Sequence, residues 1–322
     1  MTDVRVLSED HVASLLSLSD LLPEIERAFV KQGCGEVERP PRPHYPVGTK
    51  TPGTALTMPA YVHGDATYAT KLAAVHEANA ERNLPTVNAQ VAVTDAETGL
   101  PLAYLAGTRV TNARTGCIGG LAARELATGP VRLGVFGAGA QARWQTRAIA
   151  AATDLERVRI YSPSDSRESC AADLRERFPD VDVAAVDSPD EVVSDANVVV
   201  TATTSTEPVF DGARLTPGTL VVAVGAFTSE MRELDEETVR RASRLFADVP
   251  EEAVETGDFA DSDVGVTDLT PLSDVFEGAV GREDDGEILV VGSVGSAVLD
   301  AVTAELLYEK AREADVGSVV DL

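Results

Sequence analysis

Several residue types are scarce in this 322-residue chain, and each scarcity excludes a class of protein. The three cysteines, Cys34, Cys117 and Cys170, are far apart, which argues against a disulfide framework or a zinc cluster. The four histidines show no metal-binding spacing, so we expect no metal site. The sequence also contains no G-x-S-x-G elbow and no P-loop, which leaves hydrolase and kinase functions without a motif.

Long apolar runs are missing as well. The sequence has no uncharged apolar stretch of membrane-spanning length, and Met1-Thr2-Asp3-Val4 does not resemble the start of a signal peptide. We therefore expect a cytoplasmic protein with no membrane partner. The length and the 44% content of hydrophobic residues are typical of a chain with two globular domains.

Basic residues are few, and lysine is the rarer kind. The chain has 27 Lys and Arg against 53 Asp and Glu, a net charge of −26, and only four of the 27 are lysines. The acidic residues are spread along the chain, which indicates a surface adapted to high salt and a halophilic source. An ordinary acidic cytosolic protein is the alternative. Such a surface repels phosphate backbones, so we expect no nucleic-acid partner.

The N-terminal part of the chain combines helical and strand patterns. Helical patterns open at Ser8 and near Ser19, where Ser19-Asp20 resembles an N-cap, and residues 38–54, rich in proline and glycine, are expected to be extended or loop-like. Strands are expected at Val4–Leu7, Leu56–Pro59, Tyr68–Val75, Asn88–Thr94 and Leu102–Leu105. This part therefore predicts two helices beside a mostly antiparallel sheet.

The pattern changes after a helix expected over Thr111–Leu126. Short apolar strands, most of them separated by helical patterns, are expected at Val131–Phe136, Val158–Tyr161, Val181–Val186, Asn197–Thr201, Leu220–Val224, Arg244–Ala247 and Ile288–Val291. This alternation is typical of an α/β fold with a doubly wound parallel sheet. A last long helix is expected after Gly295.

A glycine-rich turn joins the first of these strands to a helical segment. Gly137 would allow a tight turn, Gly139 would let a pyrophosphate approach the backbone, and Ala142 would allow close helix–sheet packing. The predicted dinucleotide site comprises Gly137, Ala138, Gly139, Ala140, Gln141 and Ala142. A glycine turn without a cofactor is the alternative.

The end of the next strand bears on the choice of cofactor. A dinucleotide fold that binds NAD usually has an acidic residue there, whereas this chain has Ser162, Pro163 and Ser164. The serines and Arg167 would hold the 2′-phosphate of NADP, which is slightly favoured over NAD. Asp165 folded back onto the ribose, or a plain surface loop, is the alternative.

Lys71 lies among uncharged strand residues and belongs to a type that the chain almost avoids. If it faces a cleft shared with Arg42 or Arg114, burial and these cations would lower its pKa toward neutrality, which suits proton transfer. A solvent-facing lysine is the alternative. Arg114 precedes a helix rich in small residues, where it would bind a carboxylate with two hydrogen bonds. An interdomain salt bridge is the alternative for Arg114.

Further motifs occur in a fixed order along nearly the whole chain. They are Arg39-Pro40-Pro41-Arg42, Met58-Pro59-Ala60-Tyr61, Lys71 with Asn79 and Leu84-Pro85, Asp95-x-x-Thr98-Gly99-x-Pro101, Thr111-x-x-Arg114-Thr115-Gly116, the glycine-rich turn, Thr201-x-Thr203-x-x-x-Glu207-Pro208, Ala223-Val224-Gly225 and Glu233-Leu234-Asp235. In this order they resemble the ornithine cyclodeaminase/mu-crystallin family, which also includes archaeal alanine dehydrogenases and imine reductases.

The resemblance implies two domains with different roles. Residues 1–115 and 296–322 would form a substrate-binding and dimerisation domain, and residues 116–295 a dinucleotide-binding Rossmann domain. Lys71 would exchange a proton with the substrate, and Arg42 and Arg114 would flank the carboxylate and the nicotinamide. The resemblance adds cofactor contacts at Thr203, Ala223, Val224, Gly225 and Ser293. It implies a homodimer that uses NAD or NADP to transfer hydride to or from a small amino or imino acid.

Two positions depart from the cyclodeaminase pattern. Ornithine cyclodeaminases carry an aspartate shortly after the Val-Gly turn and a glutamate two positions before Met-Pro, where this chain has Phe227 and Leu56. Neither of these side chains binds an ammonium group or moves a proton. The sequence therefore favours an alanine dehydrogenase-like enzyme that converts L-alanine to pyruvate and ammonia. An ornithine cyclodeaminase that forms proline and ammonia, and a mu-crystallin-type binder of NADPH and a small ligand, are the alternatives.

Overall fold

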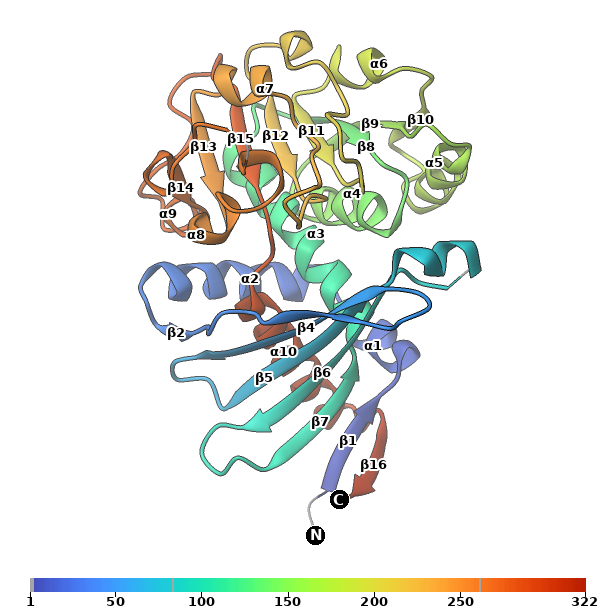
Figure 1. Cartoon of the computed structure of the whole chain (residues 1–322), viewed down its shortest axis with the longest axis vertical. Helices are drawn as coiled ribbons and strands as arrows, with labels where there is room; N and C mark the ends of the chain where they lie inside the picture. Colours follow the sequence, from blue (N-terminus) through green and yellow to red (C-terminus); the bar gives the residue numbers. More distant parts are fainter. Residues whose placement is uncertain (1–2, 83, 261) are drawn as a thin grey trace. The chain divides into compact units, whose positions relative to one another are not determined.

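The computed structural model describes residues 3–82, 84–260 and 262–322, and the chain divides into two compact units. Unit 1 comprises Met1–Arg114 and Ser296–Leu322, and unit 2 comprises Thr115–Gly295. Each unit has its own eight-stranded sheet (Figure 1). Both ends of the chain therefore contribute to unit 1.

The sheet of unit 1 is mostly antiparallel, as the sequence predicts. Its order is β16-β1-β7-β6-β5-β4-β2, with β3 paired to β4, and among the described strands of this sheet only β1 and β7 run parallel. The strands are β1 (Asp3–Leu7), β2 (Val37–Glu38), β3 (His44–Val47), β4 (Gly53–Val62), β5 (Thr67–Val75), β6 (Val87–Asp95), β7 (Pro101–Ala106) and β16 (Ser318–Asp321).

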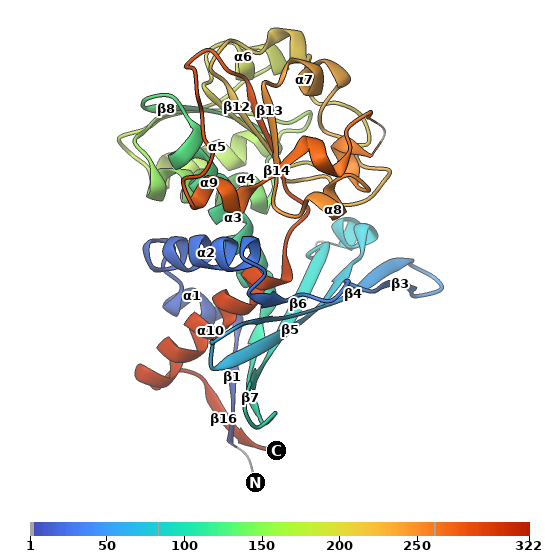
Figure 2. The same ribbon diagram turned by 90° about the vertical axis from the view of Figure 1, so that its left-hand side faces the viewer.

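The helices of unit 1 cover one face of this sheet (Figure 2). They are α1 (Glu9–Leu15), α2 (Leu18–Gly33) and α10 (Ala297–Glu313), with a 3-10 turn η1 (Glu77–Arg82), while α3 (Gly107–Leu126) has residues in both units. α2 buries an apolar stripe that includes Ile25 and Phe29. α10 packs against α2, β4 and β5. The last helix is therefore part of unit 1.

Some local predictions for unit 1 need correction. α2 begins at Leu18 after Ser17, so Ser19 lies inside the helix rather than at its N-cap. Arg114 lies inside α3 rather than before a helix, because α3 begins at Gly107 and not at Thr111. β3 agrees with the extended or loop-like conformation expected over residues 38–54, and it pairs with β4. β16 is not predicted from the sequence, because its four residues are all exposed and carry no alternation of apolar and polar residues.

The sheet of unit 2 is entirely parallel among its described strands, with the order β10-β9-β8-β11-β12-β15-β13-β14. The strands are β8 (Val131–Phe136), β9 (Leu155–Tyr161), β10 (Asp182–Ala185), β11 (Val198–Thr201), β12 (Leu220–Ala223), β13 (Arg244–Ala247), β14 (Leu269–Pro271) and β15 (Leu289–Gly292). This is the predicted doubly wound fold. The sequence does not predict β14, whose three residues are too few to show a pattern.

Helices of unit 2 lie on both faces of the sheet (Figure 1). They are α4 (Ala140–Ala152), α5 (Ser166–Arg177), α6 (Pro189–Val193), α7 (Glu236–Arg241), α8 (Pro250–Ala253) and α9 (Leu272–Phe276), with 3-10 turns η2 (Gly212–Arg214), η3 (Gly257–Phe259) and η4 (Val266–Asp268). The central strands β11, β12 and β15 are buried along their whole length. Their continuous apolar sequences follow from this two-sided cover.

The strand order of unit 2 reverses between β8 and β11. The chain passes from β8 outward to β9 and β10, then returns to β11 on the other side of β8. In open α/β sheets, ligands bind outside the carboxyl ends of the strands at such a reversal.

A helix that crosses a membrane must be both long and apolar. Among the described residues, no helix of either unit meets both requirements.

Candidate active site

A buried cluster of three charged side chains lies within unit 1. Lys71 Nζ donates a hydrogen bond to Asp300 Oδ2 over 2.6 Å, and Arg114 Nε donates to Asp300 Oδ1 over 3.2 Å. The Lys71, Asp300 and Arg114 side chains are 3%, 2% and 7% exposed. The Asp300 carboxylate therefore pairs with two cations, and the cluster carries a net positive charge that is buried from water.

The register of the sheet explains why a strand lysine is buried. Lys71 on β5 lies opposite Met58 on β4 and Val91 on β6, and all three residues are buried on the face that α10 covers. Side chains alternate between the two faces of a sheet, so a one-residue shift in the register of β5 would place the Lys71 side chain on the opposite face. The alternative of a solvent-facing lysine is therefore wrong.

α10 supplies the carboxylate from the other end of the sequence. Ser296 caps this helix by accepting a hydrogen bond from Val298 N, and its hydroxyl donates to Gln32 Oε1 on α2 over 2.7 Å. Asp300 follows in the first turn of the helix, where a negative charge is favourable. The cap thus fixes the position from which Asp300 reaches both cations.

The environment lowers the pKa of Lys71 from 10.5 to about 8. Burial is the largest cause, because it disfavours the charged ammonium. The charge of Asp300 opposes the shift, while the positive charges of Arg114 and Arg42 add to it. Lys71 therefore titrates within reach of neutral pH, the range in which an amine exchanges protons efficiently.

Arg114 has a hydrogen-bond donor without an acceptor. Its Nη1 atom is buried and has no hydrogen-bond partner among the described residues. An unpaired buried donor costs free energy unless a ligand supplies the acceptor. A carboxylate matches a guanidinium in charge and geometry. The cluster can therefore bind an anionic group beside an amine that exchanges protons.

Leu56 lies on the same face of the sheet as Lys71. The register pairs Leu56 with Ala73 and Met58 with Lys71, so Leu56 is two residues further along that face of β4. The neighbouring strand positions Met58, Ala73 and Val91 are also apolar. These four strand positions therefore provide no carboxylate that could pair with a charged substrate side chain.

Sequence reasoning missed Asp300. The signal that would have found it is a single charge inside the apolar stretch that runs from Ala297 to Ala304, in a helix whose first half is buried. A charged residue at such a position is almost never fully buried unless it is paired. The sequence does not reveal the partner, because Lys71 is 229 residues away.

The glycine-rich turn of unit 2 has the geometry that its sequence predicts. Gly137 has φ +103°, and a Cβ atom there would lie 2.4 Å from the Ala202 carbonyl oxygen. Gly139 has open space where a Cβ atom would lie. Ala142 is fully buried against the sheet. Only glycine fits at position 137, and the backbone at Gly139 is left accessible to a ligand.

The N-terminus of α4 is available to an anion. Gly139 is the N-cap residue, and no side chain caps the helix there. The first backbone N–H groups of a helix need acceptors, and a phosphate supplies them. Arg143 Nη1 donates to the carbonyl oxygens of Ala138 and Gly139 over 2.6 and 3.2 Å, which orients this turn. These residues fit a dinucleotide pyrophosphate.

The other predicted cofactor residues lie at the carboxyl ends of neighbouring strands. Ala223 ends β12, Val224 N donates to the Thr201 carbonyl oxygen, and Ser293 N donates to the Ala223 carbonyl oxygen. The Ser293 hydroxyl donates to Asp248 Oδ2 over 2.7 Å, and Asp248 also accepts from Gly295 N. Asp248, which sequence reasoning missed, therefore fixes the turn that contains Ser293.

Three serine hydroxyls cluster after β9. Ser162 Oγ lies 3.5 Å from Ser164 Oγ and 3.4 Å from Ser166 Oγ, and Ser164 and Ser166 are 2.6 Å apart. Arg167 donates to the Ser162 carbonyl oxygen and to Asp187, and its buried Nε has no hydrogen-bond partner among the described residues. The three hydroxyls and the Arg167 guanidinium, which also pairs with Asp187, can donate hydrogen bonds to oxygen atoms of a ligand.

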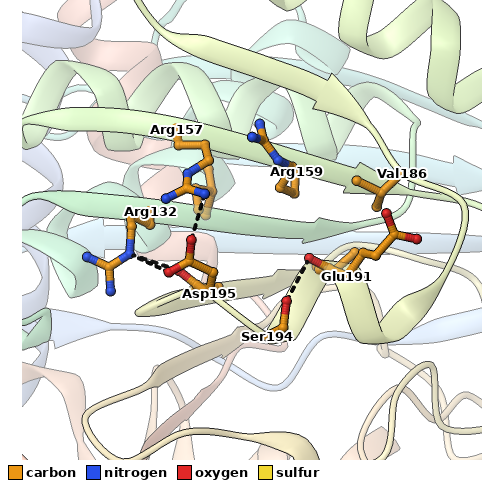
Figure 3. A pocket seen from close by; sticks show the side chains of 10 residues that line it. Arg132, Arg157, Arg159, Val186, Glu191, Ser194 and Asp195 are labelled. Carbon is orange, nitrogen blue, oxygen red and sulfur yellow. Dashed lines mark hydrogen bonds and ion pairs between the residues drawn. The ribbon is translucent and has the colours of Figure 1, made fainter.

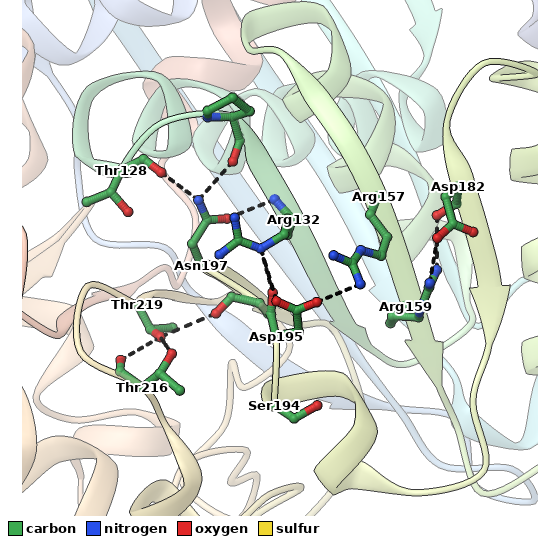
Figure 4. A network of polar contacts seen from close by, with 12 residues as sticks. Thr128, Arg132, Arg157, Arg159, Asp182, Ser194, Asp195, Asn197, Thr216 and Thr219 are labelled. Atoms are coloured by element: carbon green, nitrogen blue, oxygen red, sulfur yellow. Dashed lines mark hydrogen bonds and ion pairs between the residues drawn. The ribbon is translucent and has the colours of Figure 1, made fainter.

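A cavity of about 210 Å³ lies near the amino-terminal ends of β8 and β11, at the opposite edge of the sheet from the glycine-rich turn (Figure 3). Asp195 lies between Arg132 and Arg157 there and pairs with both, while Arg159 pairs with Asp182. Figure 4 shows how the Asn197 side chain accepts from Arg132 N and so ties β8 to the start of β11. Because these charges are paired internally, we interpret the cluster as structural.

The chain matches known proteins along almost its whole length. The model of the ornithine cyclodeaminase/mu-crystallin family matches residues 2–315. The alanine dehydrogenase of Archaeoglobus fulgidus is 32% identical over 325 residues, which cover 99% of this chain and 98% of that protein. The similarity therefore includes both units.

Two solved structures share this fold. The Δ1-pyrroline-2-carboxylate reductase of Thermococcus litoralis, in complex with NADH and L-proline, has a TM-score of 0.93 and 31% identity, covering 98% of this chain and 100% of that one. An archaeal alanine dehydrogenase dimer with bound NAD has a TM-score of 0.90 and 30% identity, covering 100% of both chains.

Proposed function

The chain belongs to the ornithine cyclodeaminase/mu-crystallin family and is an NAD(P)-dependent oxidoreductase of small amino or imino acids; within this family we propose that it is alanine dehydrogenase-like. In the proposed reaction, L-alanine, water and NAD(P)+ give pyruvate, ammonium, NAD(P)H and a proton. The observation that carries the proposal is the cluster of Lys71, Asp300 and Arg114, which combines an amine of lowered pKa with an unpaired guanidinium donor.

Arg114 binds the substrate carboxylate in this proposal. Its free Nη1 meets one carboxylate oxygen, and the net positive charge of the cluster attracts the anion. Asp300 neutralises only one of the two cations, so a bound carboxylate completes the charge balance. Holding the carboxylate also fixes the position of the neighbouring Cα atom, where the redox step occurs.

In this proposal, Lys71 Nζ exchanges a proton with the nitrogen atom of the substrate. In the oxidative direction its Nζ takes a proton from the substrate ammonium group, which frees the electron pair that stabilises the forming C=N bond. A water molecule then adds to this carbon, and Nζ returns its proton to the nitrogen as the C–N bond breaks. Of the two protons of that water, one goes to the departing ammonia, which becomes ammonium, and the other goes to solvent. Bound nicotinamide supplies the redox chemistry, because it accepts hydride from Cα in oxidation and returns it in reduction.

The apolar strand residues next to Lys71 favour a substrate with an apolar side chain. Leu56 lies on the face of the sheet that carries Lys71, and Phe227 stands where the sequence of cyclodeaminases has an aspartate. An ornithine δ-ammonium group beside Leu56 would lose hydration without gaining a charged partner from these strands. A cyclic imino acid such as Δ1-pyrroline-2-carboxylate is the second candidate, favoured by the similarity to the Thermococcus litoralis reductase.

NADP(H) is the proposed preferred cofactor, with NAD(H) also accepted. The serine cluster after β9 offers hydroxyl donors where an NAD-specific site has an acidic residue, and Arg167 contributes a buried unpaired Nε. The two similar structures contain NADH or NAD. For this reason the preference is a difference in affinity rather than an exclusion.

A homodimer is part of the proposal. The face of β4 to β7 that points away from α10 has no charged residue in a chain where 25% of residues are charged. Leu72 and Tyr104 on this face are each 43% exposed. Two copies with net charge −26 repel each other least across such a surface. Sedimentation in molar salt tests this, and a single-chain mass contradicts it.

The deciding experiment is a nicotinamide absorbance assay of the purified protein. We propose molar salt for the assay, because it screens the repulsion within so acidic a chain. NADH and NADPH are each tested with pyruvate plus ammonia and with Δ1-pyrroline-2-carboxylate. We expect oxidation of NADPH with pyruvate plus ammonia. The proposal is wrong if the protein converts ornithine to proline and ammonia but turns over no dinucleotide with any of these substrates.

A further inference from the structure

A second buried carboxylate lies in unit 2, at the carboxyl ends of β11 and β12. Glu233 is fully buried and accepts four hydrogen bonds. Its Oε1 accepts from Thr203 N over 2.6 Å and from Thr203 Oγ1 over 2.8 Å, and its Oε2 accepts from Thr201 Oγ1 and Gly225 N, both over 2.8 Å. One side chain therefore joins the ends of two adjacent strands.

The donors around Glu233 are all uncharged. Two are backbone amides and two are hydroxyls, and no cationic side chain pairs with this carboxylate among the described residues. A carboxylate that receives four hydrogen bonds accepts in all of them only when it is ionised. Loss of its charge by substitution therefore removes acceptors from donor groups that are buried at Thr201 and partly buried at Thr203 and Gly225.

The segments that Glu233 joins are packed without spare room. A Cβ atom on Gly225 would lie 2.3 Å from the Thr203 carbonyl oxygen and 2.5 Å from Glu233 Oε1. On its other side this segment supports the glycine-rich turn, because a Cβ atom on Gly137 would lie 2.4 Å from the Ala202 carbonyl oxygen. The turn, the end of β11 and the end of β12 are thus stacked in direct contact.

Glu233 is itself held in place by another carboxylate. Asp258 Oδ1 accepts from Glu233 N over 2.6 Å and from Leu234 N over 2.7 Å. The segment that carries Glu233 has no helix or strand of its own between β12 and α7. Its conformation therefore depends on these side-chain contacts rather than on a regular ladder of backbone hydrogen bonds.

We infer that Glu233 is a positioning residue for dinucleotide binding: its carboxylate fixes Thr203 and Gly225, and through Ala202 the glycine-rich turn, in the arrangement that receives the cofactor. The inference rests on the proposed function, because it assumes that this edge of the sheet binds NAD(P). Glu233 does not touch the substrate chemistry assigned to Lys71. Its removal acts on cofactor affinity and leaves the proton transfer intact.

The test is the variant Glu233→Gln, which keeps the shape but replaces one acceptor oxygen with an amide NH₂ donor. That donor faces N–H or O–H groups on either side, so at least one backbone amide loses its acceptor. We expect the dissociation constant of NADPH, measured by fluorescence titration, to rise about tenfold. Hydrogen exchange at the Thr203 or Gly225 amide accelerates, while kcat at saturating NADPH stays within about threefold.

Two further variants keep the test decisive. Glu237→Gln removes a charge from an exposed ion pair with Arg240 and is the matched control, with unchanged NADPH affinity expected. Thr201→Val removes a single hydroxyl donor to Glu233 Oε2 and answers the question if Glu233→Gln does not fold, with weaker NADPH binding again expected. If folded Glu233→Gln binds NADPH as the wild type does and both amides exchange at the wild-type rate, the inference is wrong. If the wild type binds no dinucleotide, the proposed function fails instead.

Discussion

Each unit of this protein buries one carboxylate at the centre of a polar network, and the two networks differ in their partners. In unit 1, Asp300 accepts from two cations, Lys71 and Arg114. In unit 2, Glu233 accepts from the uncharged donors of Thr201, Thr203 and Gly225. The first network keeps a net positive charge available to a ligand, whereas the second directs all its contacts into the fold.

The two networks shift the pKa of different groups, Lys71 in unit 1 and Glu233 in unit 2. Asp300 shares its site with opposite charges, and the group whose pKa moves toward neutrality is Lys71, lowered to about 8 mainly by burial. Glu233 forms no ion pair with a cation among the described residues, and burial together with the charge of Asp258 raises its pKa to about 7. A titratable amine suits proton exchange with a substrate, while the hydrogen-bonded carboxylate suits the positioning of backbone.

The largest effect is expected from Lys71→Ala. Loss of the proton-exchanging amine lowers kcat about 10³-fold, within the usual range for general acid–base groups. We expect the affinity for NADPH, which the proposed function assigns to unit 2, to stay within about twofold in fluorescence titration. Lys50→Ala, which removes an exposed lysine of unit 1, is the control and keeps full turnover. A Lys71→Ala enzyme with more than a tenth of wild-type kcat would break the assignment of the chemistry to unit 1.

Asp300→Asn tests the ion-paired side of the comparison. It leaves two buried cations without a counter-charge, so we expect a loss of about 3–5 kcal/mol in the free energy of unfolding, measured by urea denaturation. Because Asp300 raises the pKa of Lys71, its removal also moves the limb of the kcat/KM profile that reports Lys71 to lower pH. Glu313→Gln, on an exposed position of the same helix, changes neither measurement. An unshifted pH profile in folded Asp300→Asn contradicts the pairing.

Ser162→Asp tests whether unit 2 alone chooses the cofactor. An acidic side chain at this position repels the 2′-phosphate and accepts from the ribose hydroxyls of NAD. We expect the ratio of the NADPH to NADH dissociation constants to rise about tenfold. The value of kcat with saturating cofactor stays close to the wild type. Equal ratios in both proteins would mean that the serine cluster does not contact the nucleotide.

A separate prediction concerns the pH dependence of stability in Glu233→Gln. The folded pKa of Glu233, about 7, lies above its ordinary value of 4.5, so the folded state binds this proton more tightly. The resulting stabilisation is full below about pH 4.5 and is lost as the pH rises to about 7. Compared with Glu233→Gln, the wild type therefore loses stability across this window in urea unfolding. A constant difference between the two proteins from pH 4.5 to 7 contradicts the raised pKa.

Local patterns explain which parts of the fold were predictable. The glycine-rich turn, the buried strands of unit 2 and the alternating strands of unit 1 are each encoded within a few neighbouring residues, through turn geometry and hydrophobic periodicity. β14 and β16 were missed because one has three residues and the other is exposed along its length. Strand pairing at a sheet edge depends on the neighbouring strand more than on such short sequences.

The sequence by itself determined the fold class, the glycine-rich turn and the choice of Lys71 and Arg114 as candidate site residues. Only the tertiary structure showed that Asp300 pairs with Lys71 and Arg114, and that Glu233 joins the ends of β11 and β12. Asp300 lies 229 residues from Lys71, and Glu233 belongs to a segment with no regular secondary structure. Local sequence records which conformation a segment prefers, whereas the partner of a buried charge is decided by which distant elements pack together.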